Sequence, residues 1–140
     1  MKLSTRARYG TKALLELALH DGGEPVPLKE ISQRQQIPLP YLEHLISPLV
    51  QAGIVKSTRG VGGGVWLIRP PQEVALSEVI QLLEGSIALV DCVDNPEICP
   101  RSEHCITRSL WYEVKEAISG VFESITLQDL VERQRREAKP

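Results

Sequence analysis

Residues 54–68 read Ile54-Val55-Lys56-Ser57-Thr58-Arg59-Gly60-Val61-Gly62-Gly63-Gly64-Val65-Trp66-Leu67-Ile68. Two short runs rich in β-branched residues enclose a glycine-rich loop, and the helical spacing of apolar residues stops here, as expected for strands. Strand, glycine loop and strand predict a β-hairpin over 54–58 and 65–68. The loop lacks the Lys-Ser/Thr ending of a nucleotide-binding loop, so its glycines either make a simple hairpin turn or let the backbone approach a partner.

Three helices are expected before this hairpin. Apolar residues repeat at helical spacing over residues 3–18, with Ser4 as a plausible N-cap and residues 20–23 as the end of the helix. A short helix is predicted over 27–34, and a third begins near Pro40 and stops at Gly53. Pro48 should kink the third helix or open its last turn.

The segments after the hairpin predict further helices around a cysteine-containing loop. A helix is expected over 76–84, the loop over 86–102, a long amphipathic helix over 103–125, and a charged, frayed tail over 127–139. The fold class is therefore mainly α with a small β-hairpin wing: a winged helix-turn-helix plus a long C-terminal dimerisation helix. Two domains are expected: residues 1–71, with the three helices and the hairpin, and residues 72–140, with the cysteine loop and the long helix.

Composition and charge narrow the classes of function. The chain has 140 residues, 42% hydrophobic and 24% charged, which is typical of a globular protein of the cytoplasm. No apolar run approaches the ~18 residues of a membrane span. Residues 1–70 carry nine Lys/Arg against five Asp/Glu, a balance of +4, whereas residues 71–140 carry seven against thirteen, a balance of −6. The basic front half is the part expected to meet a polyanion.

Helix, helix, helix and wing is the order of a DNA-reading unit, because a major groove about 12 Å wide admits one helix. On the third helix, Glu43 could accept a hydrogen bond from a cytosine amino group, while Tyr41 and Ser47 suit phosphate oxygens. Arg59 could enter a minor groove. The full set of candidate DNA-binding residues is Arg6, Arg8, Tyr41, Glu43, His44, Ser47, Arg59, Gly62 and Gly63. The same elements could also serve a protein-binding adaptor.

The three cysteines of the chain, Cys92, Cys99 and Cys105, lie within a polar loop and are the candidate metal ligands. Thiolates hold zinc and iron–sulfur clusters. Zinc usually draws on a C-x2–4-C pair, which is absent here, whereas a thiol redox switch and inert cysteines remain open. No nucleophile–base–orienter set accompanies the three histidines, so the chain is not expected to be an enzyme.

Several motifs resemble, in order and spacing, the IscR/NsrR-like (Rrf-two) family of winged-helix transcriptional regulators. They are Met1 to Ser4, Arg8 to Gly10, Ile37-Pro38, Tyr41 to Glu43, Arg59 to Gly64, the three cysteines and Leu110-Trp111. The resemblance covers about residues 1–125. It implies a homodimer that binds a double-stranded DNA operator, usually as a repressor, with Glu43 and Arg59 at operator-reading positions. Three cysteines at similar spacing imply an iron–sulfur cluster, [2Fe–2S] or [4Fe–4S].

This chain departs from the family pattern at the fourth cluster ligand. Arg108 stands where IscR-like members have a histidine, and Arg8 stands where NsrR-like members have an aspartate. A guanidinium stays protonated and cannot ligate iron. The fourth ligand is therefore expected to be weak, exchangeable or a carboxylate, with Asp91, Asp94, Glu97 and Glu103 in the loop and His104 as the one nearby imidazole.

The long helix of residues 103–125 carries an apolar stripe of Leu110, Val114, Ile118, Val121 and Ile125. The stripe is too long to bury against one small winged helix. A two-fold pair of such helices would cover it and would place two reading helices one turn of DNA apart, roughly 34 Å. The alternative is a core helix within one chain.

Overall fold

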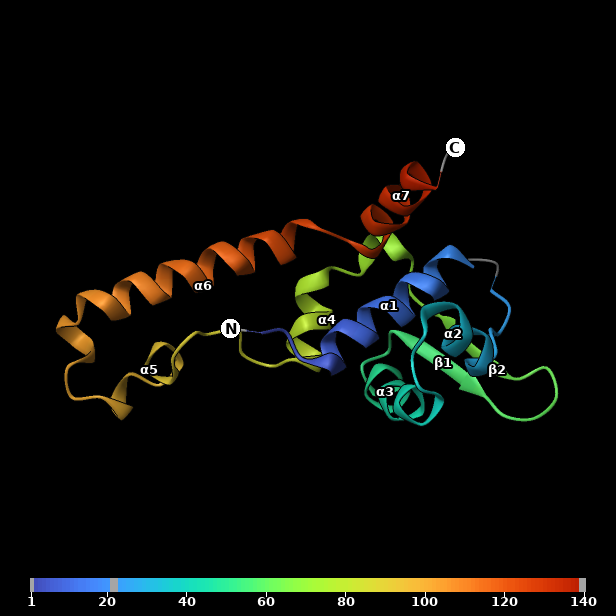
Figure 1. The fold of residues 1–140 in the computed structure, drawn as a ribbon, viewed down its shortest axis with the longest axis horizontal. Helices are drawn as coiled ribbons and strands as arrows, with labels where there is room; N and C mark the ends of the chain where they lie inside the picture. The colour runs from blue at the N-terminus through green and yellow to red at the C-terminus, as the bar shows by residue number, and fades with distance from the viewer. Residues whose placement is uncertain (1, 21–22, 139–140) are drawn as a thin grey trace.

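The computed structural model describes residues 2–20 and 23–138. Its element order is α1 (Thr5–Leu19), α2 (Leu28–Gln35), α3 (Leu39–Gln51), β1 (Val55–Thr58), β2 (Gly64–Leu67), α4 (Leu76–Leu83), α5 (Asp91–Asp94), α6 (Ile106–Ser124) and α7 (Leu127–Glu137), with short 3-10 helices at η1 (Pro71–Glu73), η2 (Pro96–Ile98) and η3 (Ser102–His104). The helices α1 to α4, the hairpin and α7 gather into one body, from which α6 extends as an arm with α5 at its far end (Figure 1). The predicted mainly α fold with a β-hairpin wing is confirmed.

The predicted helix starts and stops are largely confirmed. Ser4 is the N-cap of α1, and its side chain accepts a hydrogen bond from the Ala7 backbone N–H at 3.0 Å. The helix ends at Leu19 with His20 as its C-cap; Asp21 and Gly22, which the sequence placed in the same ending, lie outside the described residues. Pro48 lies inside α3 without opening its last turn, because the Ala52 N–H still donates to the Pro48 carbonyl at 3.0 Å.

The hairpin pairs β1 with β2 in antiparallel register, Val55 opposite Leu67 and Thr58 opposite Gly64. A further pair of hydrogen bonds joins Val65 to Val26, at 2.8 and 2.9 Å. A Cβ on Gly64 would lie 2.4 Å from the Val26 carbonyl oxygen, so only glycine fits where the hairpin meets the segment before α2. The wing is thereby fixed at its base.

The expectation of a frayed tail is wrong for residues 127–137. These residues form α7, which begins with a capping box in which Thr126 and Asp129 each bond the other's backbone N–H, at 3.2 and 2.9 Å. Leu127 and Val131 are buried, and α7 packs on α1. Hydrogen bonds from Leu127 N–H to Val74 and from Leu76 N–H to Ile125 join the start of α7 to the start of α4. Lys139 lies outside the described residues.

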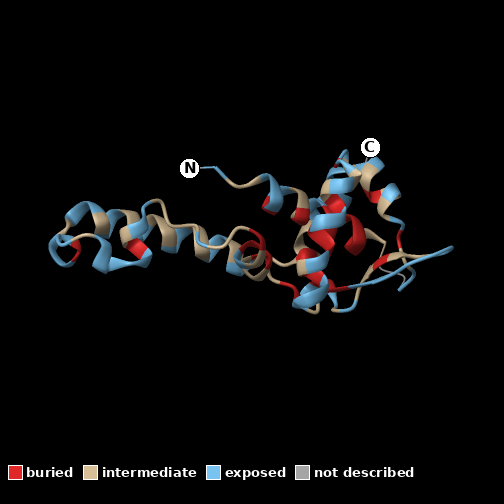
Figure 2. Cartoon of the chain, turned by 90° about the horizontal axis from the view of Figure 1, so that it is seen from below, coloured by how far each residue is buried: buried red, intermediate tan, exposed pale blue. Residues whose placement is uncertain are grey.

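The hydrophobic core lies in the body and is absent from the described length of the arm. Buried side chains come from α1 to α4, from both strands and from α7, whereas α6 contains no buried residue (Figure 2). Residues from both sides of the predicted 71/72 boundary therefore share one core. No helix in the described part of the chain has the length and apolar character that crossing a membrane requires.

Candidate nucleic-acid interface and cysteine loop

The exposed side of α3 and the wing enclose a shared hollow. Its lining includes Glu43 from α3, and Ser57, Thr58 and Arg59 from the end of β1 and the loop that follows. Glu43 and Arg59 are both exposed. The structure thus brings together the two candidates that the sequence placed on separate elements. The hollow also contains Ser57 and Thr58, which the sequence analysis missed; their outward, exposed positions in the short strand were the available signal.

Most of the other helix candidates are exposed on α3 and α1. His44 and Ser47 are exposed on α3, and Arg6 and Arg8 are exposed on α1. Tyr41 is half-buried, because its ring packs edge-on against Tyr9 of α1 with centroids 5.4 Å apart. The guanidinium of Arg8 and the ammonium of Lys12 lie 5.8 and 5.9 Å from the Tyr9 ring centre. Two cations of α1 are therefore held next to the start of α3.

The glycine loop of the wing has structural requirements of its own. A Cβ on Gly63 would lie 2.5 Å from the Thr58 carbonyl oxygen, so the turn itself excludes a side chain there. Gly62 is exposed with φ near 79°, a conformation that favours glycine. The turn alone explains both residues, and their contact with DNA stays a prediction.

A buried carboxylate joins α2 to α1. Glu16 is 5% exposed, and its carboxylate accepts hydrogen bonds from Arg34 at 3.2 Å and from Gln35 at 2.9 Å. His20 Nδ1 lies 3.1 Å from the same carboxylate, and Arg34 also pairs with Glu30 at 2.7 Å. Because α2 packs on α3, this network sets the direction from which α3 is presented. Sequence reasoning missed it, since Glu16 resembles any polar residue of an amphipathic helix.

The three cysteines lie in the short elements that lead into α6, residues 91–105, which form the cysteine loop in the structure, and all three are half-buried free thiols. Cys92 is in α5, Cys99 follows η2, and Cys105 is the N-cap residue of α6. Within residues 2–20 and 23–138, no three His, Cys, Asp or Glu side chains are already grouped to hold a metal ion. Any group held by all three sulfurs therefore requires the loop to close around it.

Two hydrogen bonds favour the thiolate form of Cys105. A hydrogen bond with the Thr107 hydroxyl, at 3.2 Å, is the largest cause that lowers the pKa of its thiol, followed by the backbone N–H of Arg108. The thiolate is the form that binds metals and attacks oxidants. The N-terminus of α6 thus favours the reactive form of this side chain.

Arg108 joins the two ends of the cysteine loop. Its guanidinium donates to the carbonyls of Cys92, at 2.8 Å, and Val93, at 3.3 Å, from a position one turn after Cys105. This arginine stands where the resemblance would place a histidine ligand, and here it holds the backbone of the first cysteine beside the helix that begins at the last.

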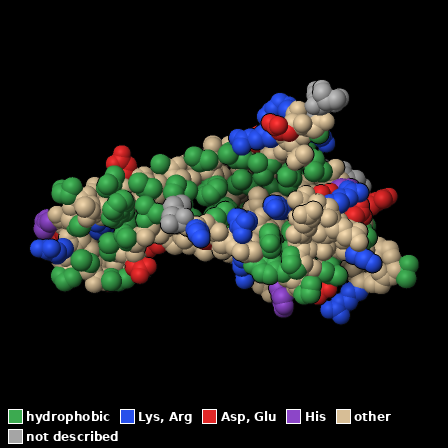
Figure 3. All heavy atoms as spheres, viewed as in Figure 1, with side chains coloured by type: hydrophobic (Ala, Val, Ile, Leu, Met, Phe, Trp, Pro, Cys, Tyr) green, Lys and Arg blue, Asp and Glu red, His purple; other side chains and the backbone are tan. Residues whose placement is uncertain are grey.

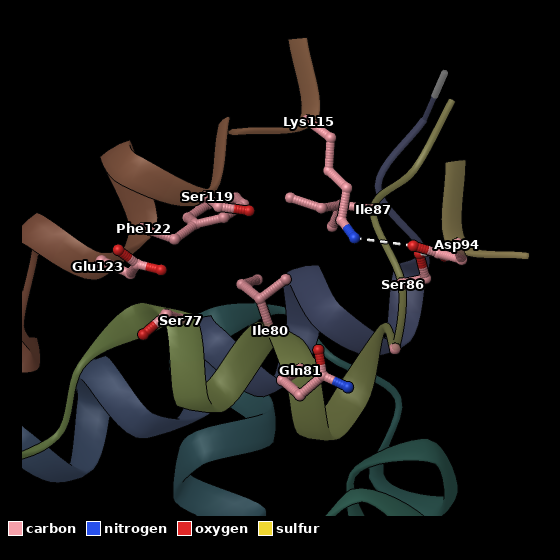
Figure 4. Close-up of a pocket in the computed structure, with 11 residues that line it drawn as sticks. Ser77, Ile80, Gln81, Ser86, Ile87, Asp94, Lys115, Ser119, Phe122 and Glu123 are labelled. Atoms are coloured by element: carbon pink, nitrogen blue, oxygen red, sulfur yellow. Dashed lines mark hydrogen bonds and ion pairs between the residues drawn. The ribbon is translucent and has the colours of Figure 1, made fainter. Parts of the chain in front are cut away.

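A second polar contact ties the loop to the arm beside a pocket between α4 and α6. Lys115 Nζ lies 2.7 Å from Asp94 Oδ1, and the Ser86 hydroxyl donates to the same carboxylate (Figure 4). These bonds, with Lys115 first, hold the pKa of Asp94 below its ordinary value. The pocket has a volume of about 380 Å³ and mixes apolar side chains such as Phe122 with polar ones. Asp94, a predicted fourth-ligand candidate, is therefore already paired, whereas Asp91, Glu97, Glu103 and His104 are exposed.

The residues of the predicted dimer stripe differ in how far they are exposed. Leu110 is 47% and Val121 56% exposed, while Val114 and Ile118 are half-buried. Ile125, at the end of the stripe, packs against the core of its own chain. Hydrophobic side chains are spread along the face of the arm visible in Figure 3.

A family model for Rrf2, described as an iron-dependent transcriptional regulator, matches residues 3–133. The chain belongs to the Rrf2 family. It is 42% identical over 134 residues to the HTH-type transcriptional regulator IscR of Serratia proteamaculans, covering 96% of this chain and 81% of that protein. It is 41% identical over 131 residues to the protein rrf2 of Nitratidesulfovibrio vulgaris, covering 94% and 87%.

Solved structures of the same kind share the fold of this Rrf2 protein. T. potens IscR matches with a TM-score of 0.82 and 38% identity over 100% of this chain and 93% of that one. CymR, the global cysteine regulator of B. subtilis, matches with a TM-score of 0.79 and 37% identity over 95% and 98%. The chain is a winged-helix transcriptional regulator and not an enzyme, as predicted.

Proposed function

We propose that this Rrf2-family regulator is a bacterial, cytoplasmic repressor that binds a double-stranded DNA operator as a homodimer and is controlled through its cysteine loop. Residues 1–71 read the DNA in this proposal, and residues 72–140 provide sensing and dimerisation. The observation that carries the DNA-binding part is the hollow in which Glu43 of α3 faces the Arg59 end of the wing. A helix and a wing that share one exposed surface can enter adjacent grooves of one duplex.

Each candidate has a distinct role on DNA. Glu43 and His44 meet base edges in the major groove, and Arg59 enters the minor groove with Gly62 and Gly63 close to the backbone. Tyr41, Ser47, Arg6 and Arg8 contact phosphates and set the register. Because phosphate contacts release counterions, affinity should fall steeply with salt.

The test of this reading is operator affinity after Arg59→Ala, measured by mobility shift on a duplex selected from a random pool. We expect affinity to weaken by roughly 1–3 kcal/mol. Arg136→Ala, an exposed arginine of α7 outside both the wing and the cysteine loop, is the matched control and should leave affinity nearly unchanged. Equal affinity of the Arg59 variant and the parent would remove the wing from the reading surface.

The exposed apolar face of α6 supports the proposed homodimer. Ile106, Leu110, Ala117 and Val121 are exposed and recur at spacings of four, seven and four residues, which places them on one side of the helix. An unshared face of this kind marks an interface, and a second copy of α6 would cover it through a two-fold axis. Val114 and Ile118 flank this face, and Ile125 lies at its end.

Leu110→Glu with Val121→Glu tests the interface by sedimentation. Both side chains are about half exposed in the single chain, so the double variant should fold but sediment as a monomer, because two charges per protomer would have to be buried. Glu116→Gln, an exposed charge of α6 outside this apolar face, serves as the control. An unchanged dimer mass in the double variant would refute this interface.

We further infer that Cys92, Cys99 and Cys105 hold an iron–sulfur cluster. The donors fit in kind, since three free thiols lie in one loop. Arg108 holds the Cys92 backbone next to the helix that begins after Cys105, and closure of the loop would have to bring the three sulfurs together. A bound cluster would supply a redox-sensitive and oxygen-sensitive centre. Hydrogen bonds with Thr107 and the Arg108 backbone lower the thiol pKa of Cys105, which favours the thiolate that binds metal. Asp91, Glu97 or Glu103, all exposed, remains available as a weak fourth ligand.

Iron and sulfide analysis of anaerobically purified protein tests this assignment. Each single Cys→Ser variant should lose the visible chromophore, whereas His104→Ala should keep most of it. Stoichiometric iron in the triple cysteine variant, or zinc without sulfide in the parent, would refute the cluster.

A thiol switch is the second candidate for the same loop. It is favoured by the lowered pKa of the half-exposed Cys105 and by three sulfurs that are not yet grouped. A parent protein that contains neither iron nor zinc, and whose operator affinity changes on mild oxidation, would establish this alternative.

A further inference from the structure

One buried polar atom in the cysteine loop has no partner. Ser102 is 6% exposed, and its Oγ is the one buried side-chain nitrogen or oxygen within residues 2–20 and 23–138 that makes no hydrogen bond. The other buried polar residue, Glu16, is bonded by both Arg34 and Gln35. Buried hydroxyls normally find a partner, because desolvation without one costs free energy.

The position of Ser102 points to what its partner is. It lies midway between Cys99 and Cys105, and its backbone N–H donates to the Cys99 carbonyl at 3.2 Å, closing a turn between them. Ser102 also opens η3, which ends one residue before Cys105. The hydroxyl is therefore enclosed within the stretch of chain that carries two of the three thiols.

The neighbours of Ser102 make its burial more informative. Arg101, Glu103 and His104 are all exposed, so the loop turns its charged groups to solvent and its one small hydroxyl inward. Thr107, by contrast, already shares its hydroxyl with the Cys105 sulfur. An inward hydroxyl without an acceptor is suited to a group that arrives when the loop closes.

We propose that Ser102 Oγ–H donates a hydrogen bond to an anionic sulfur of the iron–sulfur group held by Cys92, Cys99 and Cys105. This inference rests on the proposed cluster function. Ser102 is then a positioning residue that adjusts the group rather than a ligand that holds it. Hydrogen bonds to sulfur tune the reduction potential of such centres. The reduced form carries more negative charge on its sulfurs, so the hydroxyl stabilises that form and raises the potential.

Ser102→Ala tests the proposal, with Ser109→Ala, an exposed serine on α6, as the matched control. Three measurements are made on anaerobic protein: iron and sulfide content, the reduction potential by dye titration, and the thermal unfolding of the cluster-free form. Ser102→Ala should keep its iron and sulfide, and its reduction equilibrium should shift against the reduced form by up to about tenfold, the effect of one hydrogen bond. Ser109→Ala should match the parent in all three.

The outcomes separate this proposal from the function on which it rests. Absence of iron and sulfide from the parent refutes the cluster itself, and the role of Ser102 with it. A loaded parent whose potential is the same as that of Ser102→Ala refutes the hydrogen bond alone. Loss of iron from Ser102→Ala also overturns it, because the serine would then hold the group. A cluster-free Ser102→Ala protein less stable than the parent would show that the hydroxyl has a structural partner instead.

Discussion

The body and the arm of this regulator differ in how far they bury their side chains. In the body, Leu14, Leu49 and Leu127 are fully buried, and the buried carboxylate of Glu16 is bonded by its neighbours. In the arm, α6 buries none of its residues, and Leu110 and Val121 are about half exposed. The cysteine loop at its end adds three free thiols.

This contrast separates the groups that one chain covers by itself from those that a second copy or a bound cluster would cover. In the body, one hydrophobic core draws on α1 to α4, both strands and α7, and the buried Glu16 carboxylate is bonded by its neighbours. The arm has an uncovered apolar face and unligated sulfurs, which are the features that a second copy and a cluster would satisfy. Dimerisation and sensing are therefore expected to act on the arm, and DNA reading on the body.

The largest expected effect contrasts the two regions through a pair of leucines. Leu49→Ala should lower the free energy of unfolding by ~2–5 kcal/mol at any protein concentration, because it leaves a cavity in the body. Leu110→Ala should lower it only where the protein is dimeric, so its effect should fade on dilution. Urea unfolding at several protein concentrations checks both. A Leu110 effect that persists at high dilution would place this side chain in an intrachain core.

The next largest effect on the free energy of unfolding is expected in the polar network around Glu16. Glu16→Gln should lower the free energy of unfolding by ~1–3 kcal/mol, because it removes the carboxylate to which Arg34 and Gln35 donate. Glu30→Gln, whose partner Arg34 is half exposed, is the control and should cost under about 1 kcal/mol. Thermal unfolding measures the two. Equal losses would show that burial of Glu16 adds nothing to its pairing.

A smaller effect is expected at the junction where the arm returns to the body. Thr126→Ala should lower the free energy of unfolding by about 1 kcal/mol, because it removes the side-chain oxygen that accepts the capping bond from the Asp129 N–H. Ser124→Ala, exposed at the end of α6, is the matched change outside the cap. Amide exchange in the first turn of α7 should accelerate in the Thr126 variant alone; unchanged exchange would contradict the role of the cap.

The smallest effect concerns pH and the contact between the loop and the arm. The Lys115 ammonium, and then the Ser86 hydroxyl, lower the pKa of Asp94. A depressed carboxyl pKa adds stability that is fully present above the unfolded value of about 3.9 and is lost as pH falls through the folded value. Asp94→Asn should therefore weaken the contact by at most about 1 kcal/mol near neutrality and by nothing in strong acid.

Thermal unfolding of the parent and of Asp94→Asn is followed by the fluorescence of Trp111 on α6, in a Trp66→Phe background, so that the signal reports on the arm. The difference between parent and Asp94→Asn should narrow as pH falls below about 4 and should shrink with added salt. A difference that stays constant across this range would mean that the contact does not depend on the charge of Asp94.

The sequence predicted the features that depend on local pattern. Ser4 as a cap, the glycine hairpin and the long amphipathic helix all follow from spacing within a few residues. The helix α7 had a local signal too, Thr126 followed three residues later by Asp129 with Leu127 and Val131 on one face, which the many charges obscured. The burial of Ser102 and the bonds of Arg108 to Cys92 and Val93 depend on segments folded together, so no local pattern could supply them.

We expect the state of the cysteine loop to control DNA binding by the body. The most direct measurement is the affinity of anaerobically prepared protein for its selected duplex, before and after iron is removed by a chelator. The Cys92, Cys99 and Cys105 triple serine variant is measured alongside at the same salt concentration. We expect affinity to change by about 5- to 150-fold in the parent, the usual size of a coupling between sites, and not to change in the variant. Equal affinities of the iron-loaded and iron-free parent would contradict the claim.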